Sequence, residues 1–231
     1  MRAPIGVRLR ACADLIPACE TVADVGTDHG YLGVFLLQSG VCRRVLASDL
    51  REKPLAKARE NAARFGVSDR MELLRSDGFE AHCPGSFQTA VLAGMGGDLI
   101  ARILERAPWL RDPAYTLILQ PQSAANDLRR WLGEHGYEIR RECLVRDGGF
   151  LYSVLSVIWG QGRALTPGEQ YVSPALRREH DPLYCDYLAR VRRALEQTVS
   201  GISQSADPAD VSRLAYFRAA LEDVRAISEK E

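Results

Sequence analysis

The sequence predicts an α/β fold: a doubly wound, largely parallel sheet with an antiparallel hairpin at one edge, followed by an antiparallel helical hairpin. Three observations predict it. Short apolar runs alternate with segments of helical period as far as residue 136, and such alternation is typical of a parallel sheet covered on both faces. Two long β-type runs are joined by Asp147-Gly148-Gly149, a strong hairpin signal. Two amphipathic segments close the chain.

The expected strands are short and apolar, and most expected helices end at a glycine, which is the residue most favoured just past a helix end. The expected strands span residues 21–26, 43–50, 70–78, 89–97 and 115–122, with the hairpin at 137–160. The expected helices span residues 7–17, 31–40, 53–66, 98–107 and 124–136.

The character of the chain changes after Gly160. Residues 160–182 are punctuated by Gly and Pro, which predicts a linker. Residues 182–202 and 211–227 carry apolar side chains at helical spacing and flank a turn at 203–210. We therefore expect two domains, residues 1–162 and residues 163–231.

Composition limits the function classes. The chain has 231 residues, 46% of them hydrophobic and 26% charged, with a formal net charge of zero. It therefore has no global basic field for nucleic acid, and RNA binding would need local patches. Charges are scattered through the first 17 residues, and no apolar run approaches the length of a membrane span, so neither a signal peptide nor a membrane segment is expected. The expected compartment is the cytoplasm.

The cysteines do not indicate a metal site. None forms a C-x-x-C pair, and no His stands at zinc spacing. We expect reduced thiols, no disulfide and no metal. The six are Cys12, Cys19, Cys42, Cys83, Cys143 and Cys185.

Acidic and glycine residues gather where the expected strands end. Asp24, Gly26 and Gly30 form D-x-G-x-x-x-G between a strand and a helix, a context in which a ligand can approach the main chain. Asp49 ends the second strand, where a carboxylate accepts hydrogen bonds from ribose hydroxyls. Asp77 follows the third strand, and "AGMGG" at 93–97 follows the fourth. Strand ends of an open α/β sheet share one crevice.

Each of these residues also has a purely structural interpretation. Asp24 can fix the turn, Asp49 can cap the next helix, and Asp77 with Gly78 can form a turn. Their occurrence together at successive strand ends favours function.

The segments "VADVGTDHGYLGVFLLQSG", "VLAGMGGDLI" and "LILQPQ" closely resemble the bacterial tRNA adenine-N1 methyltransferase family that modifies the adenine at position 22. The likeness covers nearly all of the first 160 residues and continues loosely into "PLYCDYLARV". It implies a class I methyltransferase fold, S-adenosylmethionine as cofactor and tRNA as partner. One departure is Val7 before Arg8-Leu9, where the family has Lys.

The resemblance also implies the site residues. The residues expected to bind the cofactor are Asp24, Gly26, Thr27, Asp28, His29, Gly30, Asp49, Leu50, Asp77, Gly78, Ala93, Gly94, Met95 and Gly96. Asp28 and His29 are also the catalytic candidates: Asp28 would stabilise charge on the methylated adenine, and His29 would orient the base or accept a proton. The rival is that both only shape the cofactor pocket. The residues expected to contact tRNA are Arg8, Gln120, Arg177 and Arg178.

Other basic clusters can touch RNA or simply face solvent. These are Arg43-Arg44, Arg51 with Lys53 and Lys57, Arg129-Arg130, and Arg190 with Arg192-Arg193. The apolar stripes of the helical hairpin can pair within the chain, as expected for a monomer, or between two chains in a dimer.

Three other functions stay open. An NAD-linked oxidoreductase is disfavoured because the first turn is not G-x-G-x-x-G. The same fold could methylate another RNA or a small molecule. A non-catalytic RNA-binding protein with a relic pocket has no reason to keep acidic residues at three strand ends.

Overall fold

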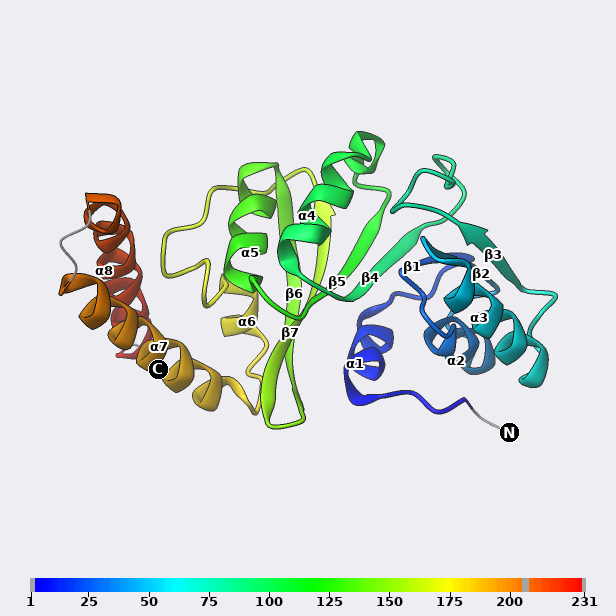
Figure 1. Cartoon of the computed structure of the whole chain (residues 1–231), viewed down its shortest axis with the longest axis horizontal. Helices are drawn as coiled ribbons and strands as arrows, with labels where there is room; N and C mark the ends of the chain where they lie inside the picture. Colours follow the sequence, from blue (N-terminus) through cyan, green and yellow to red (C-terminus); the bar gives the residue numbers. More distant parts are fainter. Residues whose placement is uncertain (1–2, 205–207, 230–231) are drawn as a thin grey trace.

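The computed structural model describes residues 3–204 and 208–229, and its centre is a seven-stranded sheet in the order β3-β2-β1-β4-β5-β7-β6 (Figure 1). The strands are β1 (Thr21–Val25), β2 (Arg44–Asp49), β3 (Met71–Arg75), β4 (Thr89–Met95), β5 (Thr116–Pro121), β6 (Tyr137–Asp147) and β7 (Phe150–Trp159). The helices around the sheet are α1 (Val7–Leu15), α2 (Tyr31–Ser39), α3 (Glu52–Arg64), α4 (Gly97–Glu105) and α5 (Ala125–Glu134), with a 3₁₀ turn at Pro108–Leu110.

The doubly wound sheet is confirmed. β1 pairs in parallel with both β2 and β4, and β5 continues the parallel part beyond β4. The chain order therefore reverses between β1 and β4, which is the switch point where open α/β sheets bind ligands. β7 inserts between β5 and β6 and is antiparallel to both.

Alternation along the buried strands divides the core between the two faces of the sheet. Val22 and Val45 face one side, in the apolar cluster that includes α1, α2 and α3. Ala23 and Leu46 face the other side, in the cluster that includes α4 and α5. This arrangement has one physical cause: successive side chains of a strand point to opposite faces, so a strand covered on both sides must be apolar throughout.

The predicted edge hairpin is confirmed, and its turn has the expected chemistry. Gly148 and Gly149 both adopt positive φ, +54° and +82°, as a two-residue type I′ turn requires. Asp147 and Phe150 face each other across this turn. The long β6–β7 ribbon therefore projects its tip well beyond the body of the sheet (Figure 1).

The helical hairpin is also confirmed. α7 (Tyr184–Ser203) and α8 (Pro208–Ser228) lie side by side (Figure 1). Leu195, Leu221 and Val224 are buried between them. The same apolar cluster includes Leu144 of β6, so the helical pair also packs on the edge of the sheet. Residues 205–207 of the predicted turn lie outside the described residues.

The segment predicted as a linker is packed against the sheet. It contains α6 (Pro174–Arg178), and the Ser173 hydroxyl caps this helix by accepting a hydrogen bond from the Leu176 N–H at 3.0 Å. Val172 and Ser173 are fully buried. The Gly and Pro residues correctly indicated irregular backbone in this segment. They carry no information about burial, and burial is what packs the segment on the sheet. The domain boundary at 162/163 stays a prediction.

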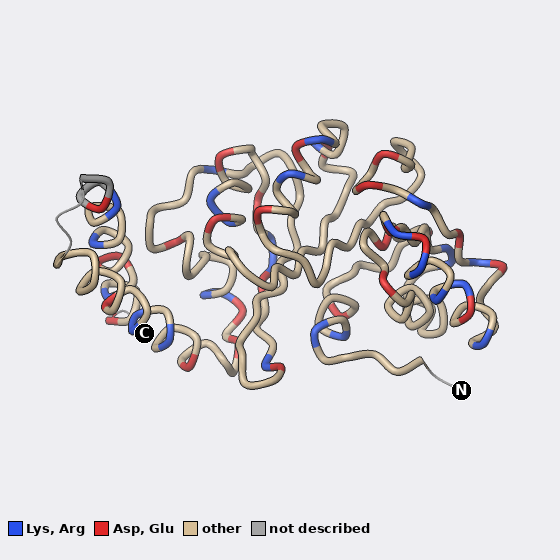
Figure 2. Tube along the Cα trace, in the orientation of Figure 1, with Lys and Arg blue, Asp and Glu red and all other residues tan. Residues whose placement is uncertain are grey.

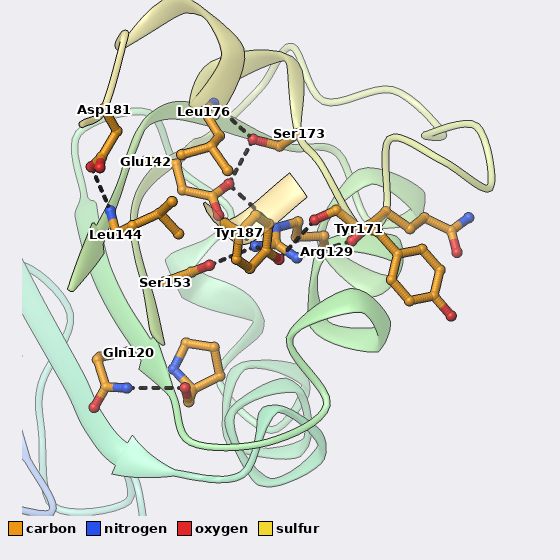
Figure 3. A network of polar contacts seen from close by, with 12 residues as sticks. Gln120, Arg129, Glu142, Leu144, Ser153, Tyr171, Ser173, Leu176, Asp181 and Tyr187 are labelled. Atoms are coloured by element: carbon orange, nitrogen blue, oxygen red, sulfur yellow. Dashed lines mark hydrogen bonds and ion pairs between the residues drawn. The ribbon is translucent and has the colours of Figure 1, made fainter. Parts of the chain in front are cut away.

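A buried ion pair joins this segment to the sheet (Figure 3). Arg129 of α5 and Glu142 of β6 are both wholly buried, and their side chains form two hydrogen bonds, Nη2 to Oε1 at 2.5 Å and Nε to Oε2 at 3.2 Å. Ser173 donates to Glu142 Oε2 at 2.6 Å, and Arg129 Nη1 donates to the Gln170 carbonyl at 3.0 Å.

The network extends to β7 and to α7. Arg129 Nη2 also donates to Ser153 Oγ at 2.7 Å and to the Tyr187 hydroxyl at 3.3 Å. Tyr187 in turn donates to the Tyr171 carbonyl at 2.8 Å. The prediction that Arg129 belongs to an RNA-binding cluster is therefore wrong, because its guanidinium is enclosed by protein acceptors.

We predict that Glu142→Ala lowers the free energy of unfolding by about 3 to 5 kcal/mol, because it leaves the Arg129 guanidinium buried without its counter-charge. Chemical denaturation followed by circular dichroism measures the change. Glu179→Ala is the matched control, because Glu179 bonds Arg141 at 2.9 Å on the surface and such pairs contribute less than about 1 kcal/mol. Equal losses in the two variants would contradict the role given to the buried pair.

Candidate active site

A cavity of about 530 Å³ opens at the carboxyl ends of β1, β2, β4 and β5. Helix α1 and the tip of the β6–β7 hairpin complete its wall. Its lining residues are Gly6, Arg8, Leu9, Asp24, Gly26, Thr27, Asp28, Leu32, Asp49, Arg51, Ala93, Gly94, Met95, Gln120, Gln122 and Asp147. Its position is the switch point between β1 and β4.

The turn after β1 has three residues with positive φ: Gly26 at +80°, Asp28 at +52° and Gly30 at +73°. This explains the two glycines, since only Gly adopts this conformation freely, and Asp is among the side chains that tolerate it best. The N–H groups of Gly26 and Thr27 donate to the Ser48 carbonyl at 2.8 and 2.9 Å. The turn is thereby fixed to the end of β2.

Two carboxylates lie at the base of this turn. Asp24 is 4% exposed and accepts a hydrogen bond from the Thr27 hydroxyl at 2.6 Å. The pKa of Asp24 is raised to about 6, chiefly because the carboxyl is buried; the Thr27 hydrogen bond opposes this rise, and repulsion from Asp49 adds to it. Asp49 accepts the N–H groups of Asp28 at 3.3 Å and Arg51 at 2.9 Å. The cavity therefore has an acidic wall, which suits a cationic ligand.

The glycine-rich turn after β4 forms the opposite wall. Gly94 has a φ of +76° and stands at a register shift between β4 and β5. Its N–H donates to Gln120 Oε1 at 3.2 Å, while Gln120 Nε2 donates to the Pro121 carbonyl at 2.9 Å. Oε1 of Gln120 thus supports the turn, and the bond from Nε2 to Pro121 in β5 fixes the orientation of the amide. A Cβ at Gly94 would meet only Gln122 Nε2, at 3.5 Å, so the backbone at Gly94 leaves room for a ligand.

The two catalytic candidates lie at the opening. Asp28 lines the cavity, whereas His29 does not. His29 Nε2 lies 3.7 Å from Asp28 Oδ2, and both side chains are at least half exposed. The backbone below them is held by Asn61, whose Nδ2 donates to the His29 carbonyl at 2.9 Å. Asp28 can therefore face a bound substrate directly, and His29 can reach it from outside the cavity.

The third wall comes from α1 and the hairpin tip. Arg8 Nε donates to Asp147 Oδ2 at 2.8 Å. The Arg8 guanidinium also lies over the Tyr152 ring, 5.0 Å from its centroid. This contact holds Arg8 at the cavity wall.

Comparison with known proteins agrees with this geometry. A family model described as a methyltransferase domain matches residues 5–155. The chain is 29% identical over 206 residues to the tRNA (adenine(22)-N(1))-methyltransferase of Bacillus subtilis (strain 168), covering 87% of this chain and 86% of the relative. The family is thereby decided. The chain belongs to the TrmK-like tRNA methyltransferases, within the class I methyltransferases.

Solved structures of the family agree along the whole chain. The crystal structure of the B. subtilis m1A22 tRNA methyltransferase TrmK superposes with a TM-score of 0.85 at 26% identity, covering 97% of this chain and 99% of that one. Streptococcus pneumoniae Sp1610 in complex with S-adenosyl-L-methionine gives a TM-score of 0.79 at 28% identity, covering 94% and 100%. The likeness therefore includes the helical hairpin as well as the sheet.

Several residues that the family resemblance implies lie outside the cavity lining. Asp77 and Gly78 border a separate, smaller hollow beside His82 and Trp109, and Arg106 holds Asp77 at 3.0 Å. Gly30 and Gly96 precede α2 and α4 as their N-cap residues.

Of the other residues outside the lining, Leu50 and Arg178 are exposed and Arg177 is partly buried. Leu50 is 58% exposed, one residue past Asp49. Arg177 and Arg178 belong to α6, far along the chain from the cavity walls. A role for them needs tRNA to reach beyond the cavity.

Some lining residues were not predicted from the sequence: Gly6, Leu9, Leu32, Gln122 and Asp147. Arg51, predicted only as part of a basic cluster, also borders the cavity. Asp147 was recognised only as part of a turn signal, because its contribution depends on the hairpin tip reaching α1. Gln122 follows directly on the "LQP" segment, which was the available signal.

Between residues 3 and 204 and from 208 to 229, no cluster of three or more His, Cys, Asp or Glu side chains is arranged to hold a metal ion. Within the same residues, no helix combines the length and the apolar character that crossing a membrane requires.

The raised pKa of Asp24 gives a pH-dependent stability. The folded-state value, about 6, lies above the value of 3.8 for an unperturbed Asp, so this stabilisation is present at low pH and is lost as pH rises through about 6. Relative to Asp24→Asn, which cannot titrate, the wild type is expected to gain about 1 kcal/mol between about pH 7 and about pH 5. Urea denaturation across this range measures the difference.

The control for this measurement is Asp14→Asn, because the Asp14 side chain is 59% exposed. Its difference from the wild type should stay nearly constant over the same range. An Asp24→Asn difference that is equally constant would show that Asp24 is not perturbed by burial.

Proposed function

We propose that this protein transfers a methyl group from S-adenosylmethionine to N1 of the adenine at position 22 of tRNA. The observation that carries the proposal is the cavity at the switch point, in which two carboxylates face a glycine-bordered opening. Supporting it, the likeness to the B. subtilis tRNA (adenine(22)-N(1))-methyltransferase extends over 87% of this chain.

The residues around the cavity fit this cofactor. A volume of about 530 Å³ lies within the range of small-molecule sites, roughly 300–1,000 Å³. Each Asp49 oxygen accepts one backbone N–H and keeps a lone pair for a ribose hydroxyl. Gly94 leaves the backbone accessible on one side, while the Met95 methyl fills the space where a side chain would stand at Gly26. The acidic wall suits a positively charged sulfonium, which explains why the first turn carries Asp28 where a phosphate-binding turn has a small neutral residue.

The assignments at the adenine end of the cofactor rest on the family resemblance. Asp77 and Gly78, together with exposed Leu50, are proposed there, although Asp77 is paired with Arg106 in this structure. Binding at that end would therefore draw on the surface next to Asp49 and Arg51 as well as on the cavity itself.

The chemistry needs alignment more than a strong base. S-adenosylmethionine, when bound, supplies an electrophilic methyl group. Adenine N1 has an in-plane lone pair and is uncharged at neutral pH, so it can attack directly once it is held in line. The methylated adenine is cationic, and a fixed carboxylate nearby stabilises the developing charge. We propose Asp28 for this role, supported by its position in the cavity lining, and we propose that His29 orients the base or accepts a proton from outside the lining.

Adenine N1 lies on the Watson–Crick edge, so a stacked or paired target base must be turned out before it reacts. The first turn, α1 and the hairpin tip all contribute to the cavity wall, and we propose that the extruded base enters between them. Positive and negative side chains are interspersed over the whole molecule (Figure 2). We therefore propose that tRNA is held by shape and by individual phosphate contacts from Arg8, Arg177 and Arg178, rather than by one basic face.

We propose that the second expected domain, residues 163–231, contributes to tRNA binding while it stays packed on the sheet. Its apolar stripes pair with each other and with β6 inside one chain, which supports a monomer. We propose that the protein works in the cytoplasm, the compartment that its sequence predicts.

The proposal is tested by methyl transfer from labelled S-adenosylmethionine to unmodified bulk tRNA, followed by digestion to nucleosides. 1-Methyladenosine is the expected product, and primer extension should then stop at position 22. Transfer to a different nucleoside would refute the substrate while leaving a methyltransferase. No transfer from a preparation that binds the cofactor would refute tRNA methylation altogether.

Asp28→Asn separates the two roles of Asp28. If its charge stabilises the transition state, the single-turnover rate should fall by about 10²-fold or more, as for the loss of one stabilising group in an active site, with cofactor affinity unchanged. Equilibrium binding and rapid quench measure the two quantities on one preparation. Lost cofactor affinity with an unaltered rate at saturation would assign Asp28 to the pocket instead.

A further inference from the structure

We propose that the tip of the β6–β7 hairpin is a nucleobase-stacking site, in which the Phe150 ring supports an unpaired base of the tRNA beside the extruded adenine. The proposal rests on the proposed function for its partner, an RNA, and adds a binding surface outside the cofactor cavity.

Phe150 stands out by its exposure and its position together. It is 65% exposed, the largest value among the exposed large hydrophobic side chains of the described residues. A single exposed apolar residue is common in soluble proteins and is not by itself evidence of a binding site. Phe150, however, begins β7 directly after the tight turn and faces Asp147 across it, and Asp147 lines the active-site cavity. Phe150 is therefore the cross-strand neighbour of Asp147, a residue of the cavity wall.

Planar groups lead from the ring toward the cavity. The centroids of Phe150 and Tyr152 are 6.4 Å apart, with their planes at 49°. Tyr152 lies under the Arg8 guanidinium at 5.0 Å, and Arg8 lines the cavity. Aromatic rings and guanidinium planes are the groups on which unstacked bases pack in RNA complexes. Phe150, Tyr152 and Arg8 therefore form a continuous stacking surface, which we call the aromatic track.

The tip is held from both sides. Arg8 of α1 bonds Asp147, and from α7 the Arg190 guanidinium donates to the Gly149 carbonyl at 3.3 Å. Arg146 also pairs with Asp186 of α7 at 2.6 Å. A ring fixed in this way loses little entropy when a base packs on it. Arg8 and Arg146 are each paired with an aspartate, whereas Arg190 bonds an uncharged carbonyl. The positive charge of Arg190 beside the tip suits a phosphate backbone, and an apolar protein surface would gain little from it.

The chemistry gives the track a purpose. Extruding the target adenine breaks its stacking with the neighbouring bases, which costs free energy. A ring that packs on an exposed neighbour recovers part of this cost without reading its sequence, since every base has a π-face. No side chain that lines the active-site cavity is aromatic. His29 lies beside the first turn, and the hairpin tip supplies a ring on the other side, next to Asp147.

The test compares Phe150→Ala, Phe150→Leu and Phe150→Trp with Leu99→Ala, which removes an exposed apolar side chain from α4 instead. Three quantities are measured for each: kcat/KM for tRNA, Kd for tRNA and Kd for S-adenosylmethionine. We expect the Ala and Leu variants to lose about tenfold in kcat/KM and in tRNA affinity, as is typical when a stacking ring is removed. Phe150→Trp should retain both values, Leu99→Ala should match the wild type, and cofactor affinity should not change.

A second readout uses 2-aminopurine in place of the nucleotides that flank the target adenine. Stacking on Phe150 should quench its fluorescence in the wild-type and Trp complexes and not in the Ala complex. Equal quenching in all three would overturn the proposal. So would a Leu variant that behaves as the wild type, because apolar contact would then suffice without a ring, and so would losses in Leu99→Ala as large as those in Phe150→Ala.

Failure of the stacking site and failure of the proposed function give different results. If wild-type protein methylates tRNA at position 22 and the Phe150 variants do the same at equal rates, only the stacking site is wrong. If the wild type binds tRNA without methylating it, the proposed function is wrong, and the tRNA Kd values of the variants decide the stacking site. A wild type that does not bind tRNA overturns both.

Discussion

The buried Arg129–Glu142 pair is the interaction on which the arrangement around the active site depends. Charges at zero exposure are costly unless every hydrogen-bonding atom has a partner, and here the partners come from β7, the 160–182 segment and α7. The hydrogen bonds of the Arg129 guanidinium thus form only where β6, β7, the 160–182 segment and α7 meet. The Arg129–Glu142 pair fixes the edge strands β6 and β7, and these strands carry the hairpin tip that reaches the cavity.

The cavity itself depends on a different constraint, the conformation of the turn after β1. Three residues with positive φ in five positions curl the backbone so that two N–H groups reach the Ser48 carbonyl. Asp24 and Asp49 are brought close as a result, and the repulsion between them adds to the effect of burial on Asp24. A pocket lined by carboxylates in this way is poorly suited to phosphate. It is well suited to a cofactor that carries a positive centre.

These two constraints act on one site from opposite ends. The turn after β1 borders the pocket that we propose for the methyl donor, and the edge hairpin brings Asp147 to the wall of the same cavity. Arg8 connects them, since it borders the cavity while bonding Asp147 and lying over Tyr152. A protein with zero net charge can in this way present a small number of fixed groups to tRNA instead of a broad basic surface.

The sequence alone determined the order of strands and helices, the hairpin turn at Gly148-Gly149 and the acidic and glycine residues of the first turn. These features are local: side-chain period, helix ends and positive φ depend on residues close together in the chain. The family followed from the same segments, "VADVGTDHG" and "AGMGG".

Only the tertiary structure decided which of these residues meet. It joined Arg8, Asp147 and Tyr152 at the rim, buried Arg129 although Arg130 beside it is exposed, and packed the 160–182 segment on the sheet. It also directed Gln120 into support of Gly94 and placed Asp77 beside Arg106. The physical reason is that burial and pairing between residues distant in sequence depend on how whole elements pack, and no local pattern in the sequence carries that information.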